Sequence, residues 1–576
     1  IENNVKAQEQ LSLLGMVPIV IQMLCPSHLL DTLTGGSCVR PNTTSSEAIC
    51  PLTIEAARFV HQISCSPNPT LLQMLIGAGG LHALVQMISF SSEMPDGKSY
   101  VYTTENTANS AIDLSTPSGL TASHSEKNSI ESPNTSEKAA QLVYMGVDCI
   151  LQMFSVQSSR TRDFCRLFMK LGLLSHLAIA FKNIMELHYS KIKRLQSHTA
   201  SRSSSPLSSQ FSENEDRDEL KTSPESQIEE TFECKYASSI ANILLYFSRS
   251  DPMVAENMEK SGVLTVINDT LKLVAVSSSQ EEKEREIEKT DEQFTALSFS
   301  PLYLQVIEVL LKCIKNLSME PSALQILQKA DTIPTLIQLL NSPIADRCEN
   351  HVLPSMFNLC HVNRGRQQQA AVHGLIPHLQ RLIVENSHLR QFALRIVCDF
   401  AHSTAECREQ LWKHEGVVFF LNLLHEKYWQ SNIALNALAT WLTNDRDRVE
   451  QVLCVSDNVC LLVDFFRSVS AEEILSLHKP LLDLMSKSKL LCRALGCSGL
   501  FVSFLVKRLQ DAETIVLRSL LKMIQLLHQH HPCPRQLVLD YGLFDIVREF
   551  RREEKQVLVY QIATRLYREF QSSTLT

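Results

Sequence analysis

The stretch LLQMLIGAGGLHALVQMI, residues 71–88, is the first place where residue type and spacing could do chemistry. Gly77, Gly79 and Gly80 lie between two apolar runs, and a glycine-rich loop that opens a helix can cradle a phosphate group. The dinucleotide pattern G-x-G-x-x-G would need a glycine at position 82, where the chain has His82. The preceding LLQMLI has the apolar spacing of a helix rather than the β-branched character of a strand. The stretch therefore favours a bend between two helices over a nucleotide-binding loop.

Four other enzyme-like motifs are incomplete. GKS at 97–99 lacks the P-loop glycine five residues earlier, and DFA at 399–401 is neither D-F-G nor accompanied by an H-R-D loop. GCSG at 496–499 lacks the spacing of G-x-S-x-G, and HE at 425–426 is followed by no second histidine. We therefore predict no catalytic and no cofactor-binding residue in this chain.

The segment HQHHPCP holds the densest group of metal-ligand residue types: His528, His530, His531 and Cys533. Structural zinc sites are usually built from two separated pairs of ligands, and no second pair lies nearby. A helix that ends before Pro532 explains the segment equally well. We favour the helix end and predict no metal site.

Charge and cysteine usage exclude two further classes. The formal net charge is −8, and Lys and Arg form only short mixed clusters, so a nucleic-acid partner is not expected. The 17 cysteines are odd in number and contain no C-x-x-C, and several lie within apolar runs (Cys313, Cys360, Cys398 and Cys460). Buried free thiols of this kind indicate a reducing, cytoplasmic environment rather than a disulfide framework.

The chain shows neither a membrane-spanning pattern nor a signal peptide. The longest apolar candidate, residues 11–25, is too short and is interrupted by Gly15, Pro18 and Gln22. The chain begins at Ile1 rather than at methionine, so we expect it to be part of a longer protein.

A repeat explains the glycines. Similar turn residues recur 42, 42, 42, 41 and 43 residues apart, at Thr332, Gly374, Gly416, Asn458, Gly499 and Gly542. A helical period of about 40–47 residues is the armadillo/HEAT signature, so we predict an all-α armadillo/HEAT-like α-solenoid of three-helix repeats. The earlier turn positions Gly15, Gly80, Gly172 and Gly262 are farther apart, and each excess matches a polar insert.

This spacing predicts ten segments along the chain. They are a partial repeat (1–25), a polar insert (26–50), repeats (51–90), a disordered insert (91–137), repeats (138–190), a Ser-rich disordered insert (191–232), a repeat (233–276), an acidic linker (277–296), continuous repeats (297–571) and a tail (572–576). Pro354 falls within the last helix of one repeat, which should therefore start or kink there.

Two kinds of functional residue follow from this organisation. Solenoids bind extended partners along a concave face that the last helix of each repeat lines, and the candidate ladder there is Asn316, Asn358, Asp399 and Trp441. The asparagine amides could bind the backbone of an extended peptide, or they could be solvated polar positions and local caps. Each insert threonine or serine that precedes a proline is a phosphorylation candidate, or part of an unmodified linker: Thr116, Ser132, Ser205 and Ser223.

Several segments resemble one family. CDFAHSTAECREQLW (398–412), HEKYWQSNIALNALATWL (425–442), RVEQVL (448–453) and HHPCPRQLVLDYGL (530–543) resemble the armadillo tail of the plant mitogen-activated kinase kinase kinase epsilon class and of the related fungal septation-initiation and mitotic-exit kinases. SSRTRDFCRLFMKLGLLSHL (158–177) and SPNPTLLQMLIGAGGLHALV (66–85) also fit that tail.

The resemblance implies a Ser/Thr kinase domain ahead of Ile1, with ATP and Mg²⁺ as its cofactors, and no cofactor in the present chain. It implies cytokinesis signalling, an upstream small GTPase, a downstream kinase with a Mob-type subunit, and a place at the spindle pole or division site. We expect the chain to be the interaction scaffold that localises or regulates such a kinase. A free-standing armadillo adaptor or cargo receptor is the alternative.

Overall fold

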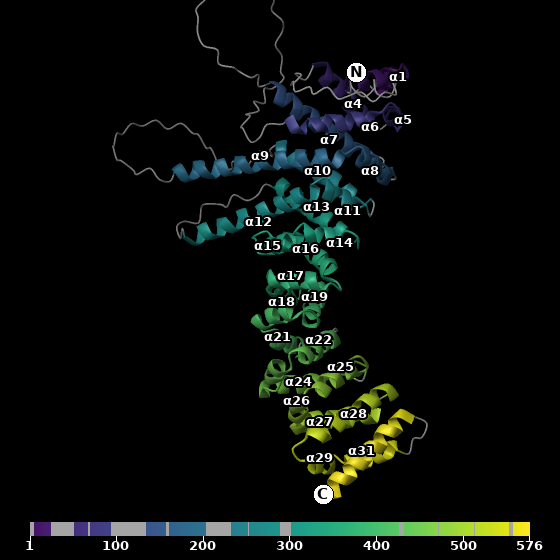
Figure 1. The fold of residues 1–576 in the computed structure, drawn as a ribbon, viewed down its shortest axis with the longest axis vertical. Helices are drawn as coiled ribbons and strands as arrows, with labels where there is room; N and C mark the ends of the chain where they lie inside the picture. The colour runs from purple at the N-terminus through teal and green to yellow at the C-terminus, as the bar shows by residue number, and fades with distance from the viewer. Residues whose placement is uncertain are drawn as a thin grey trace, which may run out of the picture. The chain divides into compact units, whose positions relative to one another are not determined.

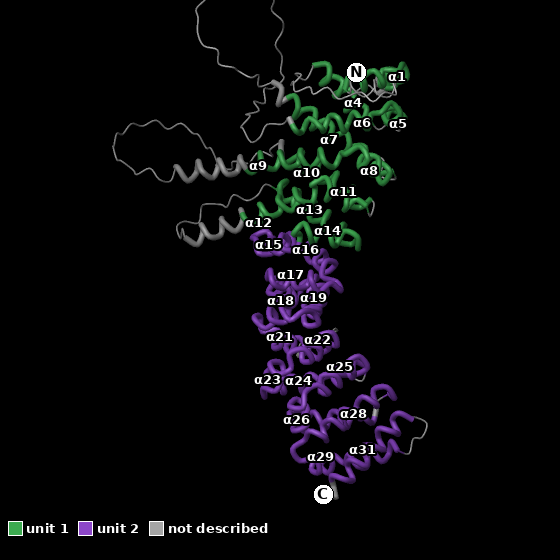
Figure 2. The backbone as a smooth tube through the Cα atoms, in the orientation of Figure 1, with its two compact units in different colours: residues 1–332 green, residues 333–576 purple. Residues whose placement is uncertain are grey.

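The computed structural model describes residues 5–24, 51–66, 69–93, 134–156, 160–202, 232–250, 253–287, 301–425, 431–470, 472–511, 513–551 and 557–575. These residues form helices and no strand, so the predicted all-α class is confirmed. The chain divides into two compact units, residues 1–332 and 333–576 (Figure 2).

Unit 1 contains four successive triads of helices (Figure 1). They are α1 (Val5–Leu13), α2 (Met16–Leu24) and α4 (Pro51–Ser64); α5 (Pro69–Gly77), α6 (Gly80–Ser89) with the 3₁₀ turn η1 (Phe90–Glu93), and α7 (Asn134–Val156); α8 (Thr161–Lys170), α9 (Leu173–Arg202) and α10 (Phe232–Ser248); α11 (Val254–Lys260), α12 (Val263–Ile287) and α13 (Pro301–Ser318). Helix α14 (Leu324–Lys329) follows, and the division between the units falls at the start of α15 (Thr332–Leu340).

Unit 2 continues the pattern. After α15 come α16 (Ala345–Cys360); α17 (Arg364–Val372), α18 (Leu375–Val384) and α19 (Arg390–His402); α20 (Ala405–Lys413), α21 (Gly416–His425) and α22 (Ser431–Asn444); α23 (Arg446–Leu453), α24 (Ser456–Ser468) and α25 (Ile474–Lys487); α26 (Lys489–Cys497), α27 (Gly499–Asp511) and α28 (Thr514–His530); α29 (Pro534–Asp540), α30 (Leu543–Phe550) and α31 (Val557–Leu575).

Within each unit, the third helix of a triad packs against the third helix of the next triad. In unit 1 the third helices α4, α7, α10 and α13 contact one another in that order, as do the second helices α2, α6, α9 and α12. In unit 2 the third helices α16, α19, α22, α25, α28 and α31 do the same. One triad cannot bury its own apolar face, and this stacking makes a continuous core within each unit. The fold is an armadillo-type α-solenoid.

Side chains from one triad satisfy the helix ends of the next. Glu450 of α23 is buried and accepts hydrogen bonds from the Ser488 hydroxyl and, at 3.3 Å, from the Leu490 N–H at the start of α26. Gln367 of α17 donates its amide to the carbonyl of Cys360 at the end of α16, at 2.9 Å. A helix end leaves four backbone groups without partners, so these contacts fix the joint as well as the helix.

The left-handed turn that precedes the second helix often lies one residue before the predicted position. Positive φ occurs as predicted at five glycines: Gly15, Gly172, Gly262, Gly374 and Gly542. In three other repeats the residue with positive φ is Gly79, Asp331 or Glu415 rather than Gly80, Thr332 or Gly416. Asn458 and Gly499 lie inside α24 and at the start of α27. Those three turn assignments at 80, 332 and 416 are therefore wrong by one residue, and those at 458 and 499 fall within helices.

Gly80 and Gly416 are explained by a close contact with a backbone carbonyl rather than by a left-handed backbone conformation. A Cβ on Gly80 would lie 2.6 Å from the Leu75 carbonyl oxygen, and a Cβ on Gly416 would lie 2.9 Å from the Leu411 carbonyl oxygen. Both glycines are buried. Glycine is thus favoured at two neighbouring positions of the repeat for different reasons: the first requires a positive φ, and the second leaves no space for a Cβ atom.

The polar inserts all fall at one place in the triad, between the second and third helix. They connect α2 to α4, η1 to α7, α9 to α10, and α12 to α13. Helices α9 and α12 run past residues 191 and 277, where the predicted inserts begin, and α7 starts before residue 138. Helix α16 continues through Pro354, so the prediction that a helix starts there is wrong.

Candidate protein-interaction surface

Four successive third helices of unit 2, α16, α19, α22 and α25, carry a half-buried polar residue at the same register. Asn358 of α16, Asp399 of α19, Thr440 of α22 and Asp483 of α25 each precede two consecutive buried residues. Successive third helices contact one another, so these residues form a row across the unit. We call Asn358, Asp399, Thr440 and Asp483 the polar ladder.

The structure corrects one member of the predicted ladder. Trp441 is 0% exposed, and its ring packs edge-on against Trp412 and Phe420, with centroids 4.9 and 6.3 Å away. Its assignment to a partner surface is therefore wrong, and Thr440 holds that register. Side-chain direction turns by about 100° per helical residue, so a slip of one position exchanges surface for core.

Asn316 occupies the equivalent place on α13 of unit 1. It is half-buried, and its amide donates to the Ser248 hydroxyl of α10 at 3.0 Å. The same register on α4, α7 and α10 holds Gln62, Gln152 and Tyr246. Unit 1 thus carries a row of polar and aromatic groups at the position of the polar ladder.

Asp399 is the centre of a charged cluster on unit 2. Burial raises the pKa of its carboxyl group, while His402, His361 and Arg395 oppose that rise. Burial lowers the pKa of His402, against the attraction of Asp399. Lys487 of α25 donates to the Ala439 carbonyl of α22 at 3.3 Å and acts electrostatically on His402. Side chains of α16, α19 and α25 therefore share one electrostatic environment.

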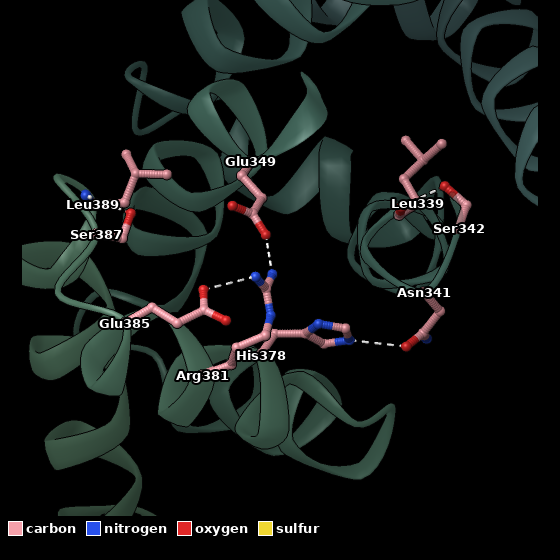
Figure 3. Close-up of polar contacts among 9 residues, drawn as sticks. All are labelled: Leu339, Asn341, Ser342, Glu349, His378, Arg381, Glu385, Ser387 and Leu389. Carbon is pink, nitrogen blue, oxygen red and sulfur yellow. Dashed lines mark hydrogen bonds and ion pairs between the residues drawn. The ribbon is translucent and has the colours of Figure 1, made fainter. Parts of the chain in front are cut away.

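A different set of polar contacts joins repeats away from the polar ladder. In Figure 3, Arg381 of α18 lies between Glu349 of α16 and Glu385, forming ion pairs with both, the second at 3.1 Å. His378 points to Asn341, whose oxygen lies 2.8 Å from its Nε2 atom. These groups satisfy one another, which indicates a structural joint rather than a binding site.

The segments that resemble enzyme motifs form helices and turns of the repeats. Residues 71–88 span α5, a turn at Gly79 and α6; residues 399–401 lie inside α19; and residues 496–499 join α26 to α27. GKS at 97–99 lies outside the described residues, as does the glutamate of HE at 425–426. Cys313, Cys360 and Cys398 are buried, but Cys460 is exposed, contrary to the prediction.

The HQHHPCP segment is the joint between α28 and α29. Helix α28 ends at His530, as predicted. His528 is buried, with its Nε2 atom 3.0 Å from the Ser573 hydroxyl, and His531 Nδ1 accepts from the Cys533 N–H at 3.0 Å. An open hollow of about 430 Å³ lies beside this joint. Across the described ranges, no three His, Cys, Asp or Glu side chains are grouped to hold a metal ion.

The phosphorylation candidates Thr116, Ser132, Ser205 and Ser223 lie outside the described residues. They remain predictions.

One described helix is long and apolar enough, by length and composition, to cross a membrane. Lys138–Val156 of α7 has a mean hydropathy of 1.4, so residues 11–25 are not the longest apolar candidate, contrary to the prediction. Three pairs of sharply bent helices would pass the same test only if each pair counted as one span. In this structure 61% of the α7 stretch is buried, and α7 contacts α4, α6 and α10. That packing accounts for its apolar composition.

Comparison with known proteins finds sequence similarity to parts of two longer proteins. It is 33% identical over 353 residues to the MAP3K epsilon protein kinase 1 of Arabidopsis thaliana, covering 59% of this chain and 24% of that protein. It is 26% identical over 526 residues to the cytokinesis protein sepH of Emericella nidulans, covering 89% of this chain and 30% of that protein. The chain thus spans less than a third of the length of these relatives.

The other comparisons add little. No family model matches the chain. A designed armadillo repeat protein of known structure is 12% identical, covering 66% of this chain and 98% of its own, with a TM-score of 0.32. The sequence matches decide the relationship: the chain is homologous to part of the MAP3K epsilon protein kinase and of the cytokinesis protein sepH, as its resemblance to that family predicted.

Proposed function

We propose that the chain is the non-catalytic armadillo region of a Ser/Thr protein kinase of cytokinesis signalling, and that it acts as an interaction scaffold. In this proposal the region binds extended segments of partner proteins and thereby localises or regulates the kinase in the cytoplasm, at the spindle pole or the division site. The relatives are named for kinase activity and for cytokinesis, which supports the setting. An upstream small GTPase and a downstream kinase are the partners that this setting suggests.

The polar ladder is the observation that carries the binding role. Its members recur at one register on consecutive third helices, and each is half-buried. Asn and Thr side chains can both donate to and accept from a peptide backbone. A partner laid across the third helices would meet one such group per repeat.

The test replaces one residue of the polar ladder, Asn358, together with Asn316, which occupies the equivalent register in unit 1. The variant Asn316→Ala with Asn358→Ala should lose recruitment of the fluorescently tagged protein to the division site in dividing cells. The matched control replaces Gln451 and Gln536 by alanine, because both are exposed on first helices of unit 2. The control should localise like the unchanged protein.

Two results would contradict the proposal. One is unchanged localisation of the ladder variant at an unchanged expression level and melting temperature. The other is phosphotransfer from ATP to a protein substrate by the purified 576-residue chain, which would make it an enzyme in its own right.

A further inference from the structure

A second row of side chains lies directly beside the polar ladder in unit 2. One helical turn earlier than Asp399, Thr440 and Asp483 of the polar ladder lie Arg395 of α19, Asn436 of α22 and Lys479 of α25. Lys522 of α28 lies one turn before Leu526, the apolar residue that α28 has at the same register. Residues four apart in a helix share a face, so these four side chains follow the polar ladder from helix to helix. Arg395, Asn436 and Lys479 are exposed, and Lys522 is half-buried. We call these four residues the outer row.

The outer row is cationic and carries no acid. Within the described residues, Arg395, Lys479 and Lys522 form no salt bridge, whereas Arg381 and Arg448 of the same unit are held by glutamates. The two acids nearby, Asp399 and Asp483, lie deeper, and burial disfavours the charged form of Asp399 by raising its pKa. The whole chain has a net charge of −8, so three cations without a salt bridge in one row depart from its average.

The spacing of the row can be compared with an extended chain. Packed helices lie about 8–10 Å apart, and an extended chain advances about 3.3 Å per residue, so one helix step corresponds to about three residues. Arg395 and Lys479 are separated by two such steps, and Lys479 and Lys522 by one. Asn436 lies between the first two, where its amide could meet the backbone of the partner.

We propose that the outer row binds an extended acidic segment of a partner protein, in which one carboxylate is followed by a second about six residues later and a third about three residues after that. The inference rests on the proposed binding role of the third helices. Exposed ion pairs are individually weak, so selectivity comes from three matched charges held in register. Because the cations are exposed, salt should weaken the binding.

The experiment selects binders for the whole chain from a random library of linear dodecapeptides. We expect recovered peptides to be enriched in Asp and Glu at the stated spacing. Replacing Arg395, Lys479 and Lys522 together by glutamine should weaken the binding of a recovered peptide about tenfold in fluorescence anisotropy. The matched control, Arg493→Gln with Lys507→Gln and Arg568→Gln, removes the same charge from exposed positions outside the row and should leave affinity within twofold.

The outcomes separate the two proposals. Recovered peptides without acidic enrichment whose binding is lost in a variant carrying Asn358→Ala and Thr440→Ala would overturn the acidic preference and leave the binding role standing. Equal losses in the outer-row variant and its control would also overturn the acidic preference. Failure to recover any peptide that depends on either row would overturn both proposals.

Discussion

Gly416 and Gly374, which begin or precede the second helix of their repeats, should respond differently to substitution by alanine. Gly416 is buried at the start of α21, and an added Cβ would lie 2.9 Å from the Leu411 carbonyl oxygen and 3.1 Å from the Trp441 ring. Gly374 has a φ of +92°, with no atom within 4 Å of an added Cβ. Gly416→Ala therefore tests a close contact, and Gly374→Ala tests backbone conformation alone.

The expected magnitudes follow from these surroundings. A left-handed backbone costs an alanine about 1–2 kcal/mol, and the stiffer unfolded chain returns about 0.4–1 kcal/mol, so Gly374→Ala should destabilise by about 1 kcal/mol or less. Overpacking costs about 1–3 kcal/mol. At Gly416 the obstacles are a backbone carbonyl and a fully buried tryptophan, which leave little room to adjust. We expect about 2–3 kcal/mol there.

Thermal melting of the whole chain, followed by circular dichroism at the helical band, measures both. A unit of this size should lose about 2–4 °C per kcal/mol, so the two variants should differ by several degrees. The opposite order, with Gly374→Ala the more damaging change, would refute the assignment of Glu415 rather than Gly416 to the left-handed turn. A melting curve for Gly416→Ala that matches the unchanged protein would refute it as well.

Two further predictions concern the joints between repeats. Burial and the neighbouring Arg381 lower the pKa of His378, so as pH falls the imidazole is protonated in the unfolded chain before it is protonated in the folded chain, and stability should be lost as pH falls through about 6.5. In urea unfolding at about pH 7.5 and pH 5.5, His378→Gln should reduce the difference between the two midpoints. An unchanged difference would contradict this prediction. Glu450→Ala removes two hydrogen bonds to a buried carboxylate at the start of α26 and should cost about 2–3 kcal/mol in urea unfolding, whereas Glu409→Ala at an exposed ion pair should have little effect.

The sequence predicted the period of the fold better than its register. Stacked triads must repeat their apolar faces at a constant interval, and that interval is visible as spacing between turns. The position of the turn residue within each repeat depends on local backbone conformation and on close contacts. Gly80 and Gly416 were assigned to turns because glycine is common there, but in both the preceding residue turns and the glycine admits a close carbonyl. Composition alone cannot separate a glycine needed for φ from one needed for space.

The same limit explains the error at Trp441. A count of about 42 residues leads from Asp399 to residue 441, yet the repeat places residue 440 at the polar register. Repeats tolerate a change of one residue in a connection, whereas a helix face does not tolerate a rotation of 100°. The clue was present in the residue type, because a tryptophan next to Leu442 suits a core more readily than a row of Asn, Asp and Thr.

Helix α7 shows a further limit of pattern alone. Its stretch Lys138–Val156 contains Asp148 and does not form an uninterrupted apolar run, so inspection of apolar runs missed it. Helix α7 is enclosed by the third helices before and after it, α4 and α10, and by α6, the second helix of its own triad. Because neighbouring helices cover it on several sides, its apolar face is wide. A long helix with such a face can have the length and the average hydropathy of a membrane-spanning helix.

Within unit 2, the residues that stabilise the joints differ from those proposed to bind a partner. The joints are made by buried acceptors and donors such as Glu450 and Gln367, which complete helix ends that would otherwise lack partners. Asp399 does the opposite. Burial raises its pKa, so the folded state holds its proton more tightly than the unfolded chain, and stability decreases as pH rises through the interval between the ordinary and the raised value. At neutral pH its charged form therefore opposes folding and forms no salt bridge with a described residue. Under the proposed binding role, a partner group that donates to Asp399 would stabilise the charged form that burial disfavours.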